Sequence, residues 1–241
     1  MTRAMTTRLA VLVAVAMLSV GCGYNAAHQK GLAEKEMERG DYISARNRLV
    51  EVTQHARSDW ESHYYLGLCH LELNEPVQAQ TQLGQAYAVQ DRHPEWTPKI
   101  LDAMAQSLYD QDRPDELYAF LRAQIDRYGT WRDYARQARF LAKSGDVDGA
   151  ALAYRKAAYF SKNRDADIYL EIAAFYEALG DPGRAVQALK WAYWINPQHT
   201  QIPTHLRRLG VVPGPTTRDE PPTLTFPGDR LFDVLLPGDN Q

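Results

Sequence analysis

The chain has 241 residues, of which 45% are hydrophobic and 24% charged, so it can form one or two globular units and is too apolar to be disordered throughout. Its 27 basic and 30 acidic residues leave a formal net charge of −3. This balance excludes a general electrostatic attraction to nucleic acid as the basis of its function.

The first residues have the pattern of an export signal. Arg3 and Arg8 precede an uninterrupted apolar run over residues 9–18, and the sequence SVGCG follows it. Such a run is shorter than the roughly 20 residues that span a bilayer, so we expect a secretory signal peptide that is cleaved. Residues 18–22, LSVGC, resemble the signal of bacterial lipoproteins, in which the cysteine becomes the lipid-modified first residue.

The lipoprotein resemblance implies a signal peptide over residues 1–21, lipidation of Cys22 and a linker over residues 22–25. Gly23, in place of an aspartate after the cysteine, points in the same terms to the outer membrane and a position facing the periplasm. The alternative is an ordinary secretory signal cleaved nearby, with an incidental cysteine and a soluble secreted or periplasmic product.

A turn recurs five times over residues 26–199, at intervals of 33 to 38 residues. A small residue stands before each turn, at Ala33, Gly67, Ala105, Ala138 and Ala173. These intervals and small residues resemble the tetratricopeptide repeat (TPR) family, whose unit is a 34-residue pair of antiparallel helices. The resemblance implies an all-α, right-handed superhelical solenoid of five repeats, over residues 26–59, 60–93, 98–130, 131–164 and 166–199.

Helix packing and turn geometry explain why small residues and glycines recur at these positions. Helices that cross at 8 to 10 Å need small side chains at the crossing. The turns need a residue tolerant of positive φ, which Gly40, Gly145 and Gly180 supply and Asn74 approximates. The third repeat departs from the pattern, with Leu117 at a small-residue position and extra residues at 94–97, so we expect it to pack least regularly.

The sequence changes character after the last repeat. Residues 200–210 are expected to form a capping helix that covers Trp191 and Trp194 through Leu206 and Leu209; the alternative is an exposed aromatic docking patch. Residues 211–241 contain six prolines and are expected to be a disordered tail. Within it, LFDVLL at 231–236 is expected either to fold back on the solenoid or to bind another protein.

Residues that could carry chemistry are few. His63 and His70 share a helix face but fall at packing positions of the repeat, which favours core histidines over half a zinc site. Cys69 is expected to be a buried thiol. The chain has no G-x-S-x-G, H-E-x-x-H, P-loop or C-x-x-C motif, so we expect no enzyme activity, no metal and no cofactor.

A basic ladder on the first helix of the fourth repeat is the predicted partner-binding site. Its members share one face at spacings of four, three and four: Arg132, Arg136, Arg139 and Lys143. In the TPR family this side faces the concave groove, so the ladder would suit an acidic peptide or a C-terminal carboxylate. Alternatively, Arg132 and Arg136 pair with Asp167 and Glu171 of the next repeat, whereas Arg139 and Lys143 stand opposite alanines.

These observations together predict a non-enzymatic scaffold that binds protein or peptide partners. The resemblances imply a lipid-anchored periplasmic TPR protein of envelope complex assembly, with no nucleic acid as partner. Two alternatives are a pilotin-like or chaperone lipoprotein for a single client, and an accessory subunit of a cell-wall enzyme.

Overall fold

A computed structural model describes residues 25–89 and 94–223 of the chain. Cys22 and the LFDVLL segment lie outside the described residues. Within these ranges the backbone forms eleven α-helices and two short 3-10 helices, and it has no strand, which confirms the all-α fold. None of the helices in these ranges is both long and apolar enough to span a bilayer. The chain divides inside α6 into two compact units, Met1–Ser107 and Leu108–Gln241.

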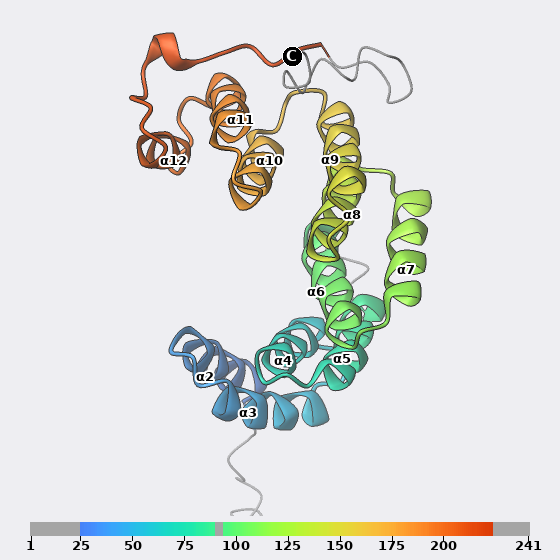
Figure 1. The fold of residues 1–241 in the computed structure, drawn as a ribbon. Coiled ribbons are helices and arrows are strands. Elements are labelled where there is room, and N and C mark those ends of the chain that lie inside the picture. The colour runs from blue at the N-terminus through green and yellow to red at the C-terminus, as the bar shows by residue number, and fades with distance from the viewer. Residues whose placement is uncertain (1–24, 90–93, 224–241) are drawn as a thin grey trace, which may run out of the picture. The chain divides into compact units, whose positions relative to one another are not determined.

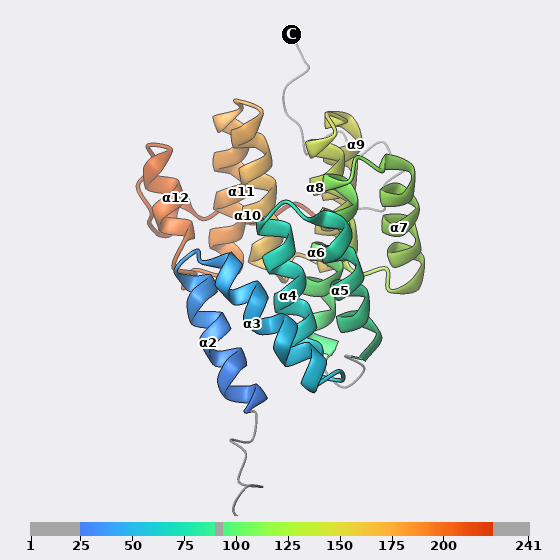
Figure 2. The same ribbon diagram turned by 90° about the horizontal axis from the view of Figure 1, so that it is seen from below.

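The N-terminal unit contains two complete helix pairs, seen side by side in Figures 1 and 2. Its elements are α2 (Ala26–Glu38), α3 (Tyr42–His55), α4 (Trp60–Glu72), α5 (Pro76–Val89), η1 (Pro94–Trp96) and the start of α6 (Thr97–Asp110). One core cluster joins α2, α3 and α4 through Ala33, Leu49 and Leu66. A second joins α4, α5 and α6 through Leu83 and Ile100. Each pair therefore buries its apolar face against its neighbour.

The C-terminal unit continues with α7 (Pro114–Arg127), α8 (Trp131–Lys143), α9 (Val147–Ser161), α10 (Ala166–Ala178), α11 (Pro182–Ile195), α12 (Ile202–Arg208) and η2 (Pro215–Thr217). Figure 1 shows α8 packed beside α9 and α10 beside α11. One continuous core runs from α8 to α12, and it contains alanines such as Ala138, Ala157 and Ala192 as well as the rings of Tyr154 and Tyr169. This is the stacked arrangement expected of a solenoid.

The turns inside the pairs have the predicted left-handed backbone. φ is positive at Gly40, Gly145 and Gly180, and also at Asn74 and Asp112, where the second and third repeats lack a glycine. In three pairs the next residue is an aspartate that caps the following helix. The carboxylates of Asp41, Asp146 and Asp181 accept hydrogen bonds from backbone N–H groups in the first turn, at 2.9 to 3.1 Å. Local sequence therefore fixes where each hairpin bends.

The small residues lie at close approaches between helices. Ala33, Ala105, Ala138 and Ala173 are at most 1% exposed, and Gly67 is buried. A Cβ atom at Gly67 would lie 2.6 Å from Cγ of Leu83, so α4 and α5 touch there without room for a methyl group. The expectation that small residues mark the helix crossings agrees with this geometry.

The extra residues at 94–97 supply an aromatic contact. Trp96 of η1 packs against Trp60 with ring centres 5.1 Å apart, and its ring lies edge-on to that of Tyr64 at 5.6 Å. The ammonium of Lys99 lies 4.3 Å from the centre of the Trp96 ring. The insertion therefore covers the start of α4.

The end of the chain is ordered further than the composition indicated. Ile202 and Leu206 of α12 are fully buried, and Leu209 packs against the same core, as expected of a cap. Beyond the cap, residues 211–223 of the predicted tail follow a defined course along α11 (Figure 1). Prolines at 213, 215, 221 and 222 disfavour an α-helix here, but they do not prevent an extended segment from packing on a helix.

Candidate functional site

The first member of the basic ladder is partly neutralised by the next repeat. Arg132 lies 3.7 Å from the carboxylate of Asp165, and its side chain is 50% exposed. Its guanidinium also stacks on the ring of Trp131, at 4.4 Å. The predicted partner, Asp167, instead lies 3.4 Å from His199. The expected pairing across the repeat boundary is therefore present for Arg132, but with a different carboxylate.

Arg136 does not lie on an accessible surface, which corrects its assignment to the ligand site. Its side chain is 1% exposed and donates a hydrogen bond of 2.9 Å to Asp133, one turn earlier in α8. The same carboxylate accepts hydrogen bonds from the backbone N–H and the hydroxyl of Thr130, at 3.0 and 2.6 Å. Arg136 therefore completes a buried network at the start of α8 and does not face a ligand.

Arg139 has a partner that the sequence did not indicate. Its Nε atom lies 3.6 Å from Oε2 of Glu171 in α10, although the repeat pattern had placed an alanine opposite it. Both side chains are about one-third exposed. The two contacting atoms, Nε of Arg139 and Oε2 of Glu171, are themselves buried, so the exposed part of Arg139 lies elsewhere on its side chain.

Lys143, the last member of the ladder, lies among aromatic rings. Its ammonium is 5.0 Å from the ring centre of Phe140 and 5.4 Å from that of Tyr109 in α6. The hydroxyl of Tyr109 donates a hydrogen bond of 3.2 Å to the backbone carbonyl of Lys143. Burial of the side chain by these neighbours lowers the pKa of Lys143; the charge of Arg139 acts in the same direction, and that of Asp110 opposes it.

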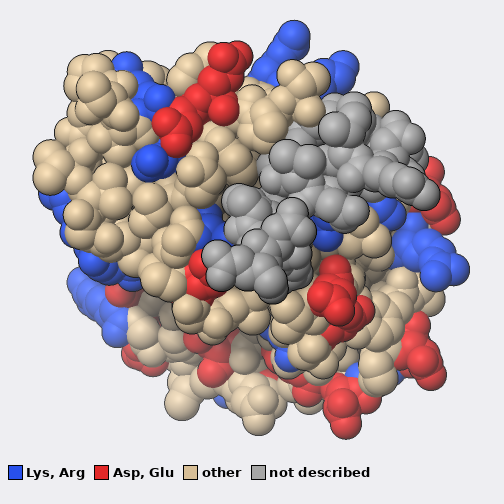
Figure 3. Space-filling model, turned by 45° about the horizontal axis from the view of Figure 1, so that its top comes forward, with Lys and Arg blue, Asp and Glu red and all other residues tan. Residues whose placement is uncertain are grey.

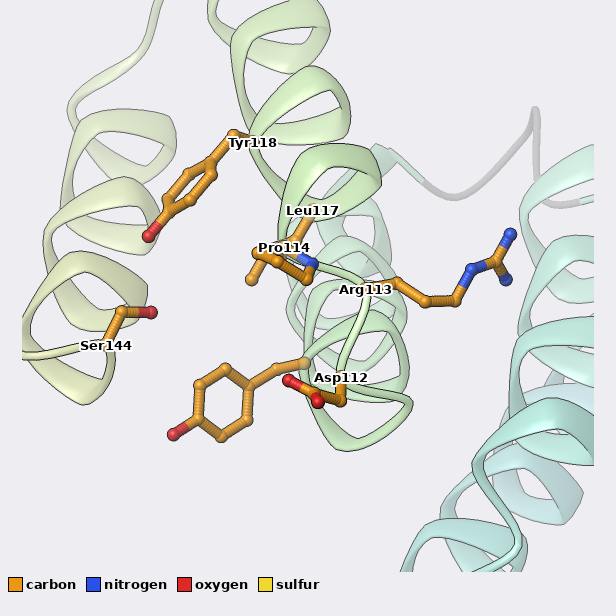
Figure 4. Close-up of a pocket in the computed structure, with 7 residues that line it drawn as sticks. Asp112, Arg113, Pro114, Leu117, Tyr118 and Ser144 are labelled. Carbon is orange, nitrogen blue, oxygen red and sulfur yellow. The ribbon is translucent and has the colours of Figure 1, made fainter.

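A pocket of about 400 Å³ opens beside Tyr109, in the irregular third repeat. It is lined by Tyr109, Asp112, Arg113, Pro114, Leu117, Tyr118 and Ser144. Figure 4 shows Tyr118 of α7 and Ser144, directly after α8, pointing into the space between their helices. The guanidinium of Arg113 turns away and donates hydrogen bonds to Glu116 and Gln111, at 2.6 and 3.1 Å.

The chemistry of this pocket suits a peptide side chain. Two tyrosine rings, a proline ring and Leu117 offer apolar area, while the hydroxyls of the tyrosines and Ser144 offer hydrogen bonds. Small numbers of polar groups in an aromatic lining are typical of ligand pockets. Sequence reasoning missed these residues. The one available signal was Leu117 at a small-residue position, because a larger side chain there holds the helices apart.

The two tryptophans of α11 have different surroundings. Trp191 packs with the core, its ring edge-on to Tyr169 at 5.7 Å. Trp194 is 43% exposed. Only Trp194 is thus available as a docking residue, and a single exposed ring is ordinary on a protein surface.

The histidines and the cysteine have structural surroundings. The ring of His63 contacts Oε1 of Gln82 and the backbone carbonyl of Arg57, at 2.8 and 3.1 Å, and His70 donates to Glu75 at 2.6 Å. Burial raises the pKa of the Cys69 thiol to about 12, so it is not a reactive thiolate. Over residues 25–89 and 94–223, no three His, Cys, Asp or Glu side chains come together as a metal site.

Basic and acidic side chains are interspersed on the face that Figure 3 presents. This agrees with the net charge of −3 and with the internal ion pairs of Arg132 and Arg139. This face therefore has no large surface of one sign.

Solved structures of TPR proteins resemble this chain. TTC0263, a thermophilic TPR protein of Thermus thermophilus, is 13% identical, with a TM-score of 0.54 over 77% of this chain and 98% of its own. YrrB, a TPR protein with an unusual peptide-binding site, is 14% identical, with a TM-score of 0.44 over 76% and 92%. The TPR2AB domain of yeast Sti1 is 15% identical, with a TM-score of 0.37 over 78% and 84%.

The first of these comparisons establishes the class of the protein as an α-helical solenoid with the TPR fold. No family model and no curated protein sequence matches the chain. At 13% identity the comparison shows the fold alone, so the role of each site follows from its own residues.

Proposed function

We propose that this protein is a non-enzymatic scaffold that is anchored by lipid at Cys22, faces the periplasm from the outer membrane, and binds protein or peptide partners of an envelope complex. Stacked helix pairs are well suited to such a role, because each pair packs on its neighbours and the stack presents an extended surface to a partner. The export pattern of residues 1–22 supports the location.

The observation that carries the binding role is the pocket beside Lys143. The pocket has apolar rings on its walls, and the ammonium of Lys143 lies 5.4 Å from one of them, that of Tyr109. An acidic peptide or a C-terminal carboxylate would place its charge at Lys143 and its neighbouring side chain between Tyr109 and Tyr118. Arg139, whose side chain is about one-third exposed, would add to the attraction.

Photo-crosslinking in cells tests the pocket. A photoreactive residue at Tyr118 should trap a partner, whereas the same residue at Leu152, which is 41% exposed on α9, should not. Lys143→Glu should reduce the Tyr118 product, and Arg139→Glu combined with it should reduce the product further. Raising the salt concentration should weaken the product of the wild-type ladder, because salt screens the attraction. Identical products from both positions, or an undiminished product in the folded double variant, would place the binding surface elsewhere.

Lipidation is tested separately. Metabolic labelling with a radioactive fatty acid should tag the wild-type chain and not Cys22→Ser, and fractionation should move the variant from membranes to the periplasm. Equal labelling of both chains would exclude the anchor while leaving the pocket proposal intact. The identity of the crosslinked partner distinguishes a general scaffold from a chaperone for one client or an accessory subunit of a cell-wall enzyme.

A further inference from the structure

The chain after the cap returns along the last repeat as an extended segment. The backbone N–H of Val211 donates to the carbonyl of Leu206 at 2.9 Å, and Gly210 adopts a φ of +79°. A turn at 214–217 follows, closed by a hydrogen bond of 2.7 Å from the hydroxyl of Thr217 to the carbonyl of Val212. Residues 218–223, which we call the strap, then run from α11 to the connection between α9 and α10 (Figure 1).

The strap meets a different kind of group at each contact. The carboxylate of Asp219 accepts hydrogen bonds from Gln187 and Lys190 of α11, both at 3.3 Å. The guanidinium of Arg218 lies 4.8 Å from the ring centre of Tyr193. Pro221 is buried, and the carbonyl of Pro222 accepts a hydrogen bond of 3.1 Å from the side-chain amide of Asn163.

The surface under the strap is built on regular structure. Gln187, Lys190 and Tyr193 of helix α11 all contact the strap. Asn163 is held in a left-handed conformation with φ of +55°, and its side-chain oxygen Oδ1 accepts a hydrogen bond from the hydroxyl of Tyr169, a core residue. The side-chain amide of Asn163 is thereby oriented towards the strap, so Asn163 would keep its position if the strap left.

The contacts that hold the strap on this surface are weak. Its ion pair is partly solvated, with Lys190 29% and Asp219 42% exposed, and Arg218 is exposed. Pairs and hydrogen bonds of this kind are individually worth little in water. Because the strap is tethered a few residues after α12, its effective concentration at the surface is on the order of millimolar, which suffices to keep it in place.

We propose that Gln187, Lys190, Tyr193 and Asn163 form a recognition site for an extended, proline-rich segment of a partner protein that carries a carboxylate, and that the chain's own strap fills this site in the absence of the partner. Gln187 and Lys190 donate hydrogen bonds to the carboxylate, and the ring of Tyr193 binds the cation that precedes it. The side-chain amide of Asn163 donates a hydrogen bond to a main-chain carbonyl. Proline-rich segments suit such a site because they are already extended and lose little entropy on binding. This site is independent of the pocket beside Lys143.

A peptide titration followed by NMR tests the proposal on the full chain. The peptide is GPTTRDEPPT, which copies residues 214–223, and the strap variant is Arg218→Ala with Asp219→Lys, which places a lysine against Lys190. We expect the peptide to shift the signals of Gln187, Lys190 and Asn163 at roughly 0.1 mM in the strap variant, about a tenth of the effective concentration at which the tethered strap fills the site. In the wild type the same shifts should need at least about tenfold more peptide, because the tethered strap competes.

Two controls make the result decisive. A peptide with lysine in place of the aspartate should not bind, and Lys190→Glu added to the strap variant should abolish binding while helicity and melting temperature stay near those of the strap variant. Equal binding to wild type and strap variant, or no shifts in the folded strap variant, would overturn the proposal. Exchange of straps between two copies, detected as a dimer that the peptide does not dissociate, would also overturn the assignment to a foreign segment.

Discussion

The contact at Gly67 allows a sharp test of how closely the helices approach. A Cβ atom added to Gly67 of α4 would lie 2.6 Å from Cγ and 2.7 Å from Cδ2 of Leu83, far inside van der Waals contact. Leu83 is fully buried between α4 and α5, so it cannot swing into solvent to make room. Gly67→Ala must therefore push the two helices apart or force Leu83 out of its rotamer.

Two opposing terms set the size of the effect. Overpacking of a tight core costs about 1 to 3 kcal/mol. Replacement of glycine by alanine inside a helix returns about 1 kcal/mol, because alanine loses less backbone entropy. The net change in the free energy of unfolding at Gly67 should thus lie between about zero and a loss of 2 kcal/mol.

Gly84 of α5 provides the matched control, because a Cβ atom there would meet nothing within 4 Å. Gly84→Ala should stabilise the protein by about 1 kcal/mol. Thermal melts monitored by circular dichroism should therefore separate the two variants by about 2 to 12 °C, at about 2 to 4 °C per kcal/mol for a chain of this size. Equal stabilisation by both substitutions would show that α4 and α5 do not approach closely at Gly67.

Three further predictions concern packing, pH and capping. Ala173→Leu, at a position 1% exposed, should destabilise by about 1 to 3 kcal/mol in urea unfolding; no loss would mean that Ala173 is not at a helix crossing. The hydrogen bond from His70 lowers the pKa of Glu75, so its stabilisation is present at neutral pH and is lost as the pH falls below 4.5. Glu75→Gln should accordingly lower the melting temperature at pH 7, and a gap that fails to narrow in acid would contradict this assignment. Asp181→Ala removes the bond of 2.9 Å from the backbone N–H of Arg184 and should cost about 1 kcal/mol, which calorimetry can check.

The hairpins were predictable because their determinants are local. A positive φ at Gly40 or Asn74 and an aspartate cap at Asp41 depend on a few neighbouring residues, so the sequence contains the whole signal. Small residues such as Ala138 recur at the repeat period because every crossing has the same geometry. These features indicate helix boundaries and register without knowledge of what lies across the interface.

Contacts between elements were not predictable in the same way. Repeat positions placed Asp167 opposite Arg132, but Asp165, at the start of α10, lies closer, and Asp167 pairs with His199. A shift of one side chain by a fraction of a helical turn decides such pairs, and the repeat pattern does not resolve it. The course of residues 211–223 also escaped prediction, since proline content excludes regular structure but says nothing about packing on α11.

The burial of Arg136 shows why a periodic row of like charges is a poor guide to a binding surface. A helix face about 100° wide has a solvent-exposed centre and half-buried flanks. Residues spaced four, three and four apart therefore lie on the same face but differ in how deeply they are buried. At the flank, Arg136 reaches Asp133 and is buried, whereas at the centre Arg139 stays near solvent. Loss of a partner from a buried pair costs about 3 to 5 kcal/mol, against about 0 to 1 kcal/mol for an exposed pair. Arg136 is therefore committed to the fold, whereas Arg139 and Lys143, whose side chains are more exposed, are the members of the ladder that the proposed ligand would contact.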